Sequence, residues 1–430
     1  LNASDNLILY ILSIILSIDK NCLIFGDFMK DIEKLKNDEP LTIDDARIIY
    51  QAAIGTINAG KSFNNWRQDK NLAFFDGVCY TVCEILTREC LSGGYRLESK
   101  DDKVLKMIEN WGKKTKLSNE FYRMFFNSNA GGNALLVLTP VNGDVYLSTY
   151  PVDRCIFQIN RTEDVTSVML LNRFTAGETV YYAKEVREII DGKGYYKVML
   201  AKGTLVNSPT WQSDILKQIP DCIENQFRYS YGNIEINTWY ELPNGIRNIG
   251  VYNVKNKAQA VAIADMPGYA DSSLHTALDV LYSIDYNYTQ AQVDMYMGKS
   301  RALIPKQMQS ATINTGRVNV AEGLSFSENI RQAQLEEDFY TEIFTQGGEP
   351  VKPTFIQADL RGEAHKYIRD SDLELLASKV GLSSSTLANH LTYNNSKTAT
   401  EVRSEQDTTE KTVNEKRALA NEPINQMLSD

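Results

Sequence analysis

The stretch that decides the fold is Arg301-Ala-Leu-Ile-Pro305, because a helical pattern precedes it over 271–300 and a second one follows it over 361–380. The second pattern breaks at Gly381-Leu-Ser-Ser-Ser385, and the chain restarts as a polar helix at Lys397-Thr-Ala-Thr-Glu-Val402. Two helices that enclose an insert, followed by a loop and a third helix, indicate separate pieces with separate tasks.

The first helical pattern rests on apolar residues with a rough helical period, and Asp271 or Ser272 can cap its start. The residues that carry the period are Leu274, Leu278, Leu281, Tyr288 and Met297. At about 1.5 Å of rise per residue, a helix over 271–300 would be about 45 Å long, which suits a strut better than a globular core.

The insert over 301–360 is irregular and ends in the loop Gln346-Gly-Gly-Glu-Pro350. Its short β-prone pieces are 302–304, 317–320 and 324–326. In the helical pattern after it, the residues expected on one apolar side are Ala364, Ile368, Leu375 and Leu376.

The third helix, predicted over 397–421, is almost wholly polar, and Pro423 is expected to kink or end it. Its apolar contacts are Ala399, Val402, Val413 and Leu419. The segment 382–396 before it is rich in Ser, Thr and Asn, whose side chains favour local bonds to the backbone over helix. The sequence therefore predicts a loop over 382–396.

Residues 45–270 predict an α+β body in which helices come first and an antiparallel sheet follows. Asn142-Gly143 between two apolar runs is a strong hairpin signal, and Asp191-Gly-Lys-Gly194 is a second turn. The expected helices cover 42–54, 77–90, 101–111 and 118–129. The expected strands cover 134–138, 145–147, 165–174, 179–190, 195–200, 234–240 and 249–252.

Length and charge limit the function classes. A chain of 430 residues is expected to form two or more domains. A net charge of −10 argues against a tight clamp on nucleic acid, which needs clustered cations. Three of the six cysteines, Cys79, Cys83 and Cys90, share one predicted helix at spacings that suit no zinc site. We expect them to be buried thiols in a reducing compartment.

Residues 1–44 form a predicted helical segment of unclear role. The apolar run over 7–18 has twelve residues, whereas a membrane span needs about twenty. Asp5 is the only charge before it, and a signal peptide requires positive charge there. A buried or ring-contact helix is the expectation, and no membrane contact is predicted.

Gly55-Thr-Ile-Asn-Ala-Gly-Lys-Ser62 fits the phosphate-loop pattern, in which Gly55, Gly60, Lys61 and Ser62 would hold phosphate. A true phosphate loop follows a buried strand and opens a helix, and an ATPase needs a later strand that ends in an acidic metal ligand. Here an amphipathic helical pattern precedes the motif, the apolar strand over 134–138 ends in Thr-Pro, and the one over 168–171 ends in Asn-Arg. We interpret the match as a decoy.

Other chemistry has little support. The three histidines, His275, His365 and His390, are too scattered for a metal cluster, so neither a metal nor a cofactor is predicted. No nucleophile elbow is present, and the expectation is that the protein is not an enzyme.

Lys299, Arg301 and Lys306 cluster where the first helical run enters the insert. A solvated helix end explains Lys299 and Arg301 through the helix dipole, without any function. The functional alternative is a weak basic collar near a DNA path.

Several stretches resemble the portal proteins of tailed double-stranded DNA phages, in particular those of siphoviruses that infect Gram-positive hosts. They are Asn172-Arg-Phe-Thr-Ala-Gly177, Tyr282-Ser-Ile-Asp285, Gly298-Lys-Ser-Arg301, the range 375–381 and Lys397-Thr-Ala-Thr-Glu-Val402. The likeness covers about 65–430. The Lys-Thr-Ala-Thr-Glu-Val stretch, with its upstream spacing, is the more specific part.

The resemblance implies a portal-like α+β fold with a ring oligomer, most simply of twelve subunits. Its parts would be a wing body, a first stem helix, a clip, a second stem helix, a tunnel loop and a C-terminal wing or crown-base helix. In this chain they correspond to 45–270, 271–300, 301–360, 361–381, 382–396 and 397–430. The residues that would face DNA in the tunnel loop are His390, Tyr393, Asn394, Asn395 and Lys397.

The function that the resemblance implies is structural: a ring at one capsid vertex of the virion, assembled in the host cytoplasm, that conducts DNA in packaging and ejection. Its expected partners are further copies of itself, double-stranded DNA, the large terminase subunit, a head–tail adaptor, and the major capsid and scaffolding proteins. An acidic channel would let duplex slide without sticking. Two rivals stay open: a nucleotide-driven packaging ATPase, and another ring protein of the head–tail connector.

Overall fold

The computed structural model describes residues 77–176, 179–204, 215–246, 248–258, 268–297, 301–305, 339–342, 354–356, 361–391 and 399–430. They divide into two compact units. Unit 1 takes the described residues up to Ile284 and from Ser371 onward, and unit 2 takes those from Asp285 to Asp370. The predicted helix over 42–54, the apolar run over 7–18 and the phosphate-loop match lie outside the described residues.

Three helices open the described chain where the sequence predicts them. They are α4 (Val78–Leu91), α5 (Asp102–Thr115) and α6 (Leu117–Gly131). The Asp101 carboxylate caps α5 by accepting the Lys103 N–H at 2.8 Å. The apolar residues of α4 and α6 are buried, and the predicted buried thiols Cys79, Cys83 and Cys90 on α4 are confirmed.

A small antiparallel sheet follows, with β1 (Asn133–Val141) between β2 (Asp144–Pro151) and β9 (Val251–Lys255). The predicted hairpin is confirmed, because Asn142 (φ 53°) and Gly143 (φ 88°) connect β1 to β2 in left-handed conformation. Side chains of β1 alternate between its two faces, and nearly all of them are buried. The small sheet therefore separates two parts of the core.

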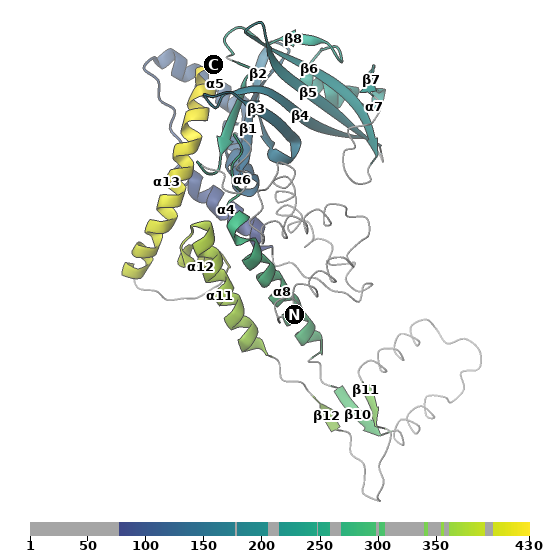
Figure 1. Ribbon diagram of the computed structural model, residues 1–430, viewed down its shortest axis with the longest axis vertical. Helices are drawn as coiled ribbons and strands as arrows, with labels where there is room; N and C mark the ends of the chain where they lie inside the picture. The colour runs from purple at the N-terminus through teal and green to yellow at the C-terminus, as the bar shows by residue number, and fades with distance from the viewer. Residues whose placement is uncertain are drawn as a thin grey trace, which may run out of the picture. The chain divides into compact units, whose positions relative to one another are not determined.

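The larger sheet is also antiparallel, in the order β3-β4-β5-β6-β7, and β8 pairs with β6. Its strands are β3 (Cys155–Ile159), β4 (Val165–Ala176), β5 (Thr179–Ile190), β6 (Lys193–Thr204), β7 (Ile215–Leu216) and β8 (Trp239–Glu241). Asp191 (φ 50°) and Gly192 (φ 78°) make the second predicted turn, between β5 and β6. The coarse expectation of an α+β protein is thus confirmed (Figure 1).

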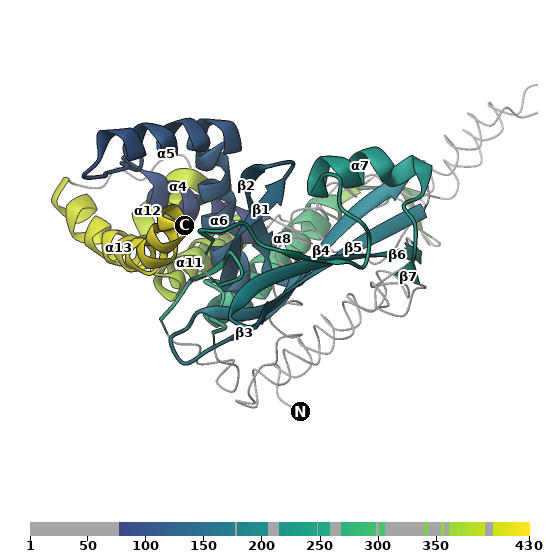
Figure 2. The ribbon, with the colours of Figure 1, turned by 90° about the horizontal axis from the view of Figure 1, so that it is seen from above.

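The body differs from the sequence prediction in several details, and strands β3 and β7 were not predicted. The strand expected over 234–240 exists only as β8, because Asn237 has a left-handed backbone (φ 64°) and donates its N–H to the Val198 carbonyl at 2.7 Å. Helix α7 (Asp221–Tyr231) was not predicted. It buries Ile223, Phe227 and Tyr231 and lies across β4 (Figure 2).

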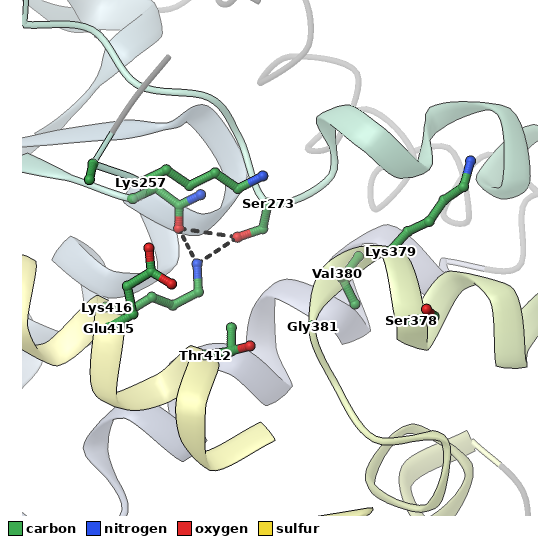
Figure 3. A pocket seen from close by; sticks show the side chains of 11 residues that line it. Lys257, Ser273, Ser378, Lys379, Val380, Gly381, Thr412, Glu415 and Lys416 are labelled. Atoms are coloured by element: carbon green, nitrogen blue, oxygen red, sulfur yellow. Dashed lines mark hydrogen bonds between the residues drawn. The ribbon is translucent and has the colours of Figure 1, made fainter. Parts of the chain in front are cut away.

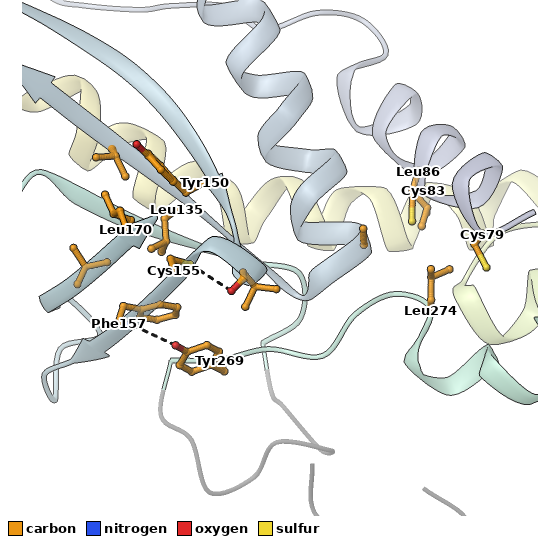
Figure 4. Packing of buried hydrophobic residues seen from close by; sticks show 14 of the residues in the cluster. Cys79, Cys83, Leu86, Leu135, Tyr150, Cys155, Phe157, Leu170, Tyr269 and Leu274 are labelled. Carbon is orange, nitrogen blue, oxygen red and sulfur yellow. Dashed lines mark hydrogen bonds between the residues drawn. The ribbon is translucent and has the colours of Figure 1, made fainter. Parts of the chain in front are cut away.

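Two hydrophobic clusters meet at β1. Leu135 and Val137 join the larger cluster with the large sheet, whereas Leu136 and Leu138 join the smaller cluster. Within the larger cluster, the Phe157 and Tyr269 rings stack at 4.3 Å between centroids, and the Tyr269 hydroxyl accepts the Phe157 N–H at 3.2 Å (Figure 4). The small sheet therefore packs on both faces.

A fully buried ion pair fastens the two sheets to each other. Arg187 and Glu185 of β5 are both 0% exposed, and Nε of Arg187 donates to Oε1 of Glu185 at 2.6 Å. The Arg187 guanidinium also donates to the carbonyls of Leu138 (2.8 Å) and Ile249 (3.0 Å) and to Oγ1 of Thr139 (3.2 Å). Arg187 of the large sheet thus bonds the Leu138 carbonyl in the small sheet and the Ile249 carbonyl next to that sheet.

The first long helix is shorter than predicted. A 3-10 turn (His275–Ala277) precedes α8 (Leu278–Met297), which has 20 residues and is about 30 Å long. Asp271 and Ser272 do not cap it, because both are buried before the turn and bond the body. Polar anchoring of this lead-in, rather than helix propensity, decides where the helix begins.

The second long helix, α11 (Gly362–Val380), agrees with its predicted bounds but not with its predicted apolar side. Ala364, Ile368 and Leu375 are exposed, and Ile368 and Leu375 are 40% and 48% exposed. Leu376 of the predicted side is buried, and it is joined by Leu373, Ala377 and Val380.

The predicted loop over 382–396 is wrong in its first half, where α12 spans Ser384–Leu391. Ser383 caps this helix, because its Oγ accepts the Thr386 N–H at 3.0 Å and its carbonyl accepts the Leu387 N–H at 3.1 Å. The serines that argued against helix therefore begin one.

The last helix, α13 (Ala399–Ser429), continues through Pro423, which does not end it. Several of its residues are buried. Along it, a regular buried stripe is formed by Thr409, Val413, Lys416, Ala420 and Met427. This stripe packs on β9 and α4 of the same chain (Figure 1). The predominantly polar helix therefore buries one stripe against its own chain.

The described part of the insert is a three-stranded sheet in unit 2. Strand β10 (Arg301–Pro305) pairs in parallel with β11 (Phe339–Glu342) and antiparallel with β12 (Thr354–Ile356). The β-prone piece at 302–304 is thus a strand, and those at 317–320 and 324–326 lie outside the described residues.

Candidate functional site

The two long helices are joined by polar contacts between their side chains. In unit 1, Nζ of Lys379 donates to both carboxylate oxygens of Asp279, at 2.8 and 2.9 Å. Ser283 donates its hydroxyl to Oδ2 of Asp372 at 2.7 Å, and Thr276 donates to the Lys379 carbonyl at 3.2 Å. Later positions on α8 meet earlier positions on α11, so the helices pair antiparallel here.

An apolar seam lies beneath these contacts. Val280, Leu281 and Ile284 on α8 are buried in one cluster with Leu376 and Ala377 of α11. The buried positions on α11 recur every three or four residues, which is the spacing of one helix face. Hydrophobic burial therefore stabilises the pair in unit 1, and the exposed ion pair adds little.

In unit 2, one carboxylate contacts an arginine and a histidine side chain. Asp294 of α8 accepts two bonds from Arg361, at 3.1 and 3.0 Å, and one from Nε2 of His365 at 2.9 Å. These hydrogen bonds, His365 first and Arg361 second, lower the pKa of Asp294 below its usual value. Nδ1 of His365 is buried without a hydrogen-bond partner among the described residues.

The end of α11 is locked by a glycine against α13. The Leu382 N–H donates to the Ala377 carbonyl at 2.9 Å, and Gly381 has a left-handed backbone (φ 74°). A Cβ at Gly381 would lie 2.4 Å from Oγ1 of Thr412, which is closer than any real contact. Next to it, the Ser383 N–H donates to Oγ1 of Thr409 at 2.8 Å. Only glycine permits this close approach of α11 to α13.

Hydrogen bonds join the lead-in to α8 to the end of α6 and to the residue after β9. Ser272 donates its hydroxyl to the Ala130 carbonyl at 2.8 Å, and the Ser273 N–H donates to the Asn129 carbonyl at 2.9 Å. The Asn256 amide, just after β9, donates to the Asp271 carbonyl at 2.8 Å. These bonds satisfy backbone groups that would otherwise be buried without partners.

A pocket of about 430 Å³ opens where these segments meet, lined by residues that follow β9, precede α8, end α11 and lie on α13. We call it the junction pocket. Its lining residues are Asn256, Lys257, Ala258, Ser273, Ser378, Lys379, Val380, Gly381, Thr412, Glu415 and Lys416. All of them belong to unit 1.

Lys416 lies at the base of the junction pocket and is 6% exposed. Its ammonium group donates to Oδ1 of Asn256 and, at 2.9 Å, to Oγ of Ser273 (Figure 3). Burial lowers the pKa of Lys416 to about 8, and the nearby charge of Lys257 adds to the effect. Lys416 therefore links α13 to the end of β9 and to the lead-in of α8 through one buried ammonium group.

Thiols near Lys416 are not reactive groups. Burial raises the pKa of Cys90 to about 11 and raises the pKa of Cys83 further still. At neutral pH both are protonated, and the thiolate, not the thiol, is the nucleophile. The arrangement can hold charge and make hydrogen bonds, and it offers no activated nucleophile.

Most of the site residues predicted from the sequence lie outside the part of the chain that the structure describes. Lys299, Lys306, Tyr393, Asn394, Asn395 and Lys397 lie outside the described residues, as do Gly55, Gly60, Lys61 and Ser62. Arg301 begins β10, where its backbone pairs with Ile356, and His390 lies in α12 rather than in a loop. The roles assigned to these residues stay predictions.

The sequence analysis missed the junction pocket. A signal was present, because Lys416 stands where an apolar residue would continue the stripe of Val413 and Ala420 on α13. Its partners Asn256 and Ser273 are more than a hundred residues away in the sequence. No local pattern could have joined the three.

Comparisons with known proteins leave the chain without an assigned family. The sequence matches no described protein family and no curated protein. A solved structure described as the virion of a native gene transfer agent particle is similar over 81% of this chain and 77% of that one, with a TM-score of 0.36 and 10% identity. A similarity this low does not establish a common fold.

Two further searches within the described residues gave negative results. No helix there has an apolar run long enough to cross a bilayer. No group of three or more His, Cys, Asp or Glu side chains gathers there as a metal site would require.

Proposed function

We propose that the chain is a phage portal protein, a subunit of the ring through which DNA enters and leaves the capsid. The observation that carries the proposal is the order of elements from α8 to α13: a helix, a strand insert, an antiparallel partner helix, a short helix and a long final helix. The sequence resemblance assigns these pieces to a stem, a clip, a tunnel segment and a wing helix.

In this proposal the pieces divide the work. The α8 and α11 pair forms part of the channel wall, the insert contacts the packaging motor and later the head–tail adaptor, and the segment after α12 faces DNA. The net charge of −10 favours a channel that repels phosphate weakly, so that duplex slides without pinning. Twelve copies at one capsid vertex, with capsid and scaffolding proteins around them, are the proposed setting.

The nucleotide-driven motor is the weaker alternative. Its support is the phosphate-loop match at 55–62, which follows an amphipathic helical pattern and not the buried strand that a true phosphate loop requires. Changing Lys61→Ala should leave ATP affinity undetectable, as in the unmodified protein. Saturable ATP binding that disappears in this variant would establish the motor instead.

Electron microscopy of the purified full chain in negative stain tests the proposal. We expect closed rings with an axial channel in end-on views. A population made only of small, separate particles at micromolar concentration would contradict the portal assignment. Filaments that never close would contradict it too, because head-to-tail contacts must close to form a channel.

A further inference from the structure

The junction pocket holds more positive charge than its contacts balance. Lys257, Lys379 and Lys416 line it, and Glu415 is the one carboxylate among the lining residues. Lys379 is neutralised by Asp279 through two short bonds. Glu415 is exposed and forms no ion pair with Lys257 or Lys416 among the described residues. The ammonium groups of Lys257 and Lys416 thus form no ion pair among the described residues, although the charge of Glu415 acts on Lys416 from a longer distance.

The buried ammonium of Lys416 is costly in this state. It has three N–H donors, and the structure gives it two acceptors, both neutral. A buried charge is stable when it is paired and fully hydrogen-bonded, and here no carboxylate of the described residues contacts the ammonium group directly. The Lys257 ammonium lies close enough to raise the cost further by repulsion. In Figure 3 both lysine side chains extend toward Ser273 at one side of the pocket.

Two hydroxyl groups also line the junction pocket. The Thr412 hydroxyl lines the pocket one turn before Lys416 on α13, and it has no hydrogen-bond partner among the described residues. The same holds for the Ser378 hydroxyl in the last turn of α11. The carbonyls of that turn are mostly occupied, since Ala377, Ser378 and Lys379 each accept a hydrogen bond. The helix end therefore presents fewer free acceptors than an open C-terminus would.

We propose that the junction pocket binds a small oxyanion of the phosphate class between the ammonium groups of Lys416 and Lys257, with the Thr412 hydroxyl as a further donor. A volume of about 430 Å³ accommodates such an ion with water around it. The bound anion supplies a counter-charge in direct contact and fastens α13 to the ends of β9 and α11. The inference stands on unit 1 alone and does not depend on the proposed ring.

The other titratable groups around Lys416 come from each element packed on it. They are Cys83 and Cys90 of α4, Lys257 after β9, Asp271 and His275 before α8, Lys379 of α11 and Glu415 of α13. Neither thiol is ionised at neutral pH, and burial keeps the pKa of His275 below its usual value. Between pH 6.5 and 9, Lys416 is thus the buried group in this set that changes charge in the folded chain.

The test is thermal unfolding of the full chain in increasing inorganic phosphate, with ionic strength held constant by chloride. We expect the unfolding midpoint to rise by a few degrees and to saturate, because a ligand that binds only the folded state stabilises it. The rise should be smaller at pH 9 than at pH 6.5. Isothermal titration calorimetry with phosphate should show one site per chain.

The variants Lys257→Met and Lys416→Met should each lose the saturable rise and reduce the phosphate affinity at least tenfold. Lys411→Met, which removes an exposed lysine from the same helix, should keep both. Lys257→Met keeps the test decisive if Lys416→Met does not fold. An equal or unsaturable rise in all variants indicates the general effect of a kosmotropic salt, and that result or the absence of any rise overturns the proposal.

Discussion

At the residue scale, the two buried cationic side chains Arg187 and Lys416 have different hydrogen-bond partners. Arg187 is fully buried and satisfied, with a carboxylate and three neutral acceptors around it. Lys416 is buried with two neutral acceptors and no carboxylate. The first fixes the two sheets to each other, whereas the second forms no ion pair among the described residues. Their variants should therefore behave differently.

Arg187→Met should destabilise the fold by about 3–5 kcal/mol, because it leaves Glu185 as a buried, unpaired carboxylate. Denaturant unfolding followed by fluorescence measures the loss. The matched control is Arg228→Met, which breaks the exposed pair with Glu224 and should cost less than about 1 kcal/mol. Equal effects of the two variants would show that the buried pair does not join the sheets as described.

Lys416 predicts a defined pH dependence. Below pH 8 it is charged in both folded and unfolded chains, so the penalty for burying it is fully present. Between about 8 and the ordinary value of about 10.4, the folded chain releases a proton that the unfolded chain keeps, so stability rises with pH. Lys416→Met lacks this rise.

The difference in unfolding free energy between the wild type and Lys416→Met should therefore shift by a few kcal/mol in favour of the wild type from pH 7.5 to 10. Burial, the largest cause of the raised pKa values of Cys83 and Cys90, acts in both proteins, whereas the smaller lowering of these pKa values by Lys416 is lost in the variant. Denaturant melts at several pH values measure it. Parallel curves would contradict the assignment of a depressed lysine pKa.

At the element scale, local chemistry made some structures predictable. The turns at Asn142-Gly143 and Asp191-Gly192 need positive φ angles at both residues, and few residue pairs meet that need. The strands they connect and the bounds of α11 followed from local patterns too. Helix α7 was not predicted, although Ile223, Phe227 and Tyr231 are four residues apart, which is the spacing of one helix face.

Other elements depend on contacts that sequence patterns do not contain. The start of α8 is decided by bonds from Ser272 and Ser273 to distant backbone, and α12 begins because Ser383 acts as a cap. The apolar side of α11 was assigned wrongly since two faces carry apolar residues and only tertiary packing chooses between them. The junction pocket escaped prediction for the same reason.

The glycine at the end of α11 gives a prediction at this scale. Gly381→Ala should cost about 1–3 kcal/mol, because the residue has a φ of 74° and the new methyl group would meet Thr412. Gly362→Ala, at the other end of the same helix, meets nothing within 4 Å and should be neutral or slightly stabilising. Comparison of the two midpoints in urea checks this, and equal values would argue against the close contact of α11 with α13.

At the scale of the whole molecule, the exposed side of α11 is a candidate contact between subunits of the proposed ring. Leu375 is 48% exposed, although the sequence pattern places it on the apolar face of the helix. Burial against a neighbouring subunit would account for a large aliphatic side chain at that position. Glu374 is the exposed neighbour of Leu375 in the sequence, so a variant at each position separates the loss of an apolar contact from the loss of a charge.

Leu375→Glu should weaken assembly at least tenfold in concentration while changing the fold's own stability by less than about 0.5 kcal/mol, the usual range for surface sites. Sedimentation velocity over a dilution series measures assembly. The control, Glu374→Gln, changes an exposed neighbour on the same helix and should assemble like the wild type. If both variants assemble normally, this face of α11 is not a subunit contact.

The mass of the purified full chain under native conditions tests the central claim most directly. One chain has a mass of 48.6 kDa, and a closed ring of twelve would have a mass of about 580 kDa. Native mass spectrometry at micromolar concentration should show a single narrow species of several hundred kilodaltons at a whole multiple of the chain mass. A stable monomer that never assembles at that concentration would contradict the portal assignment.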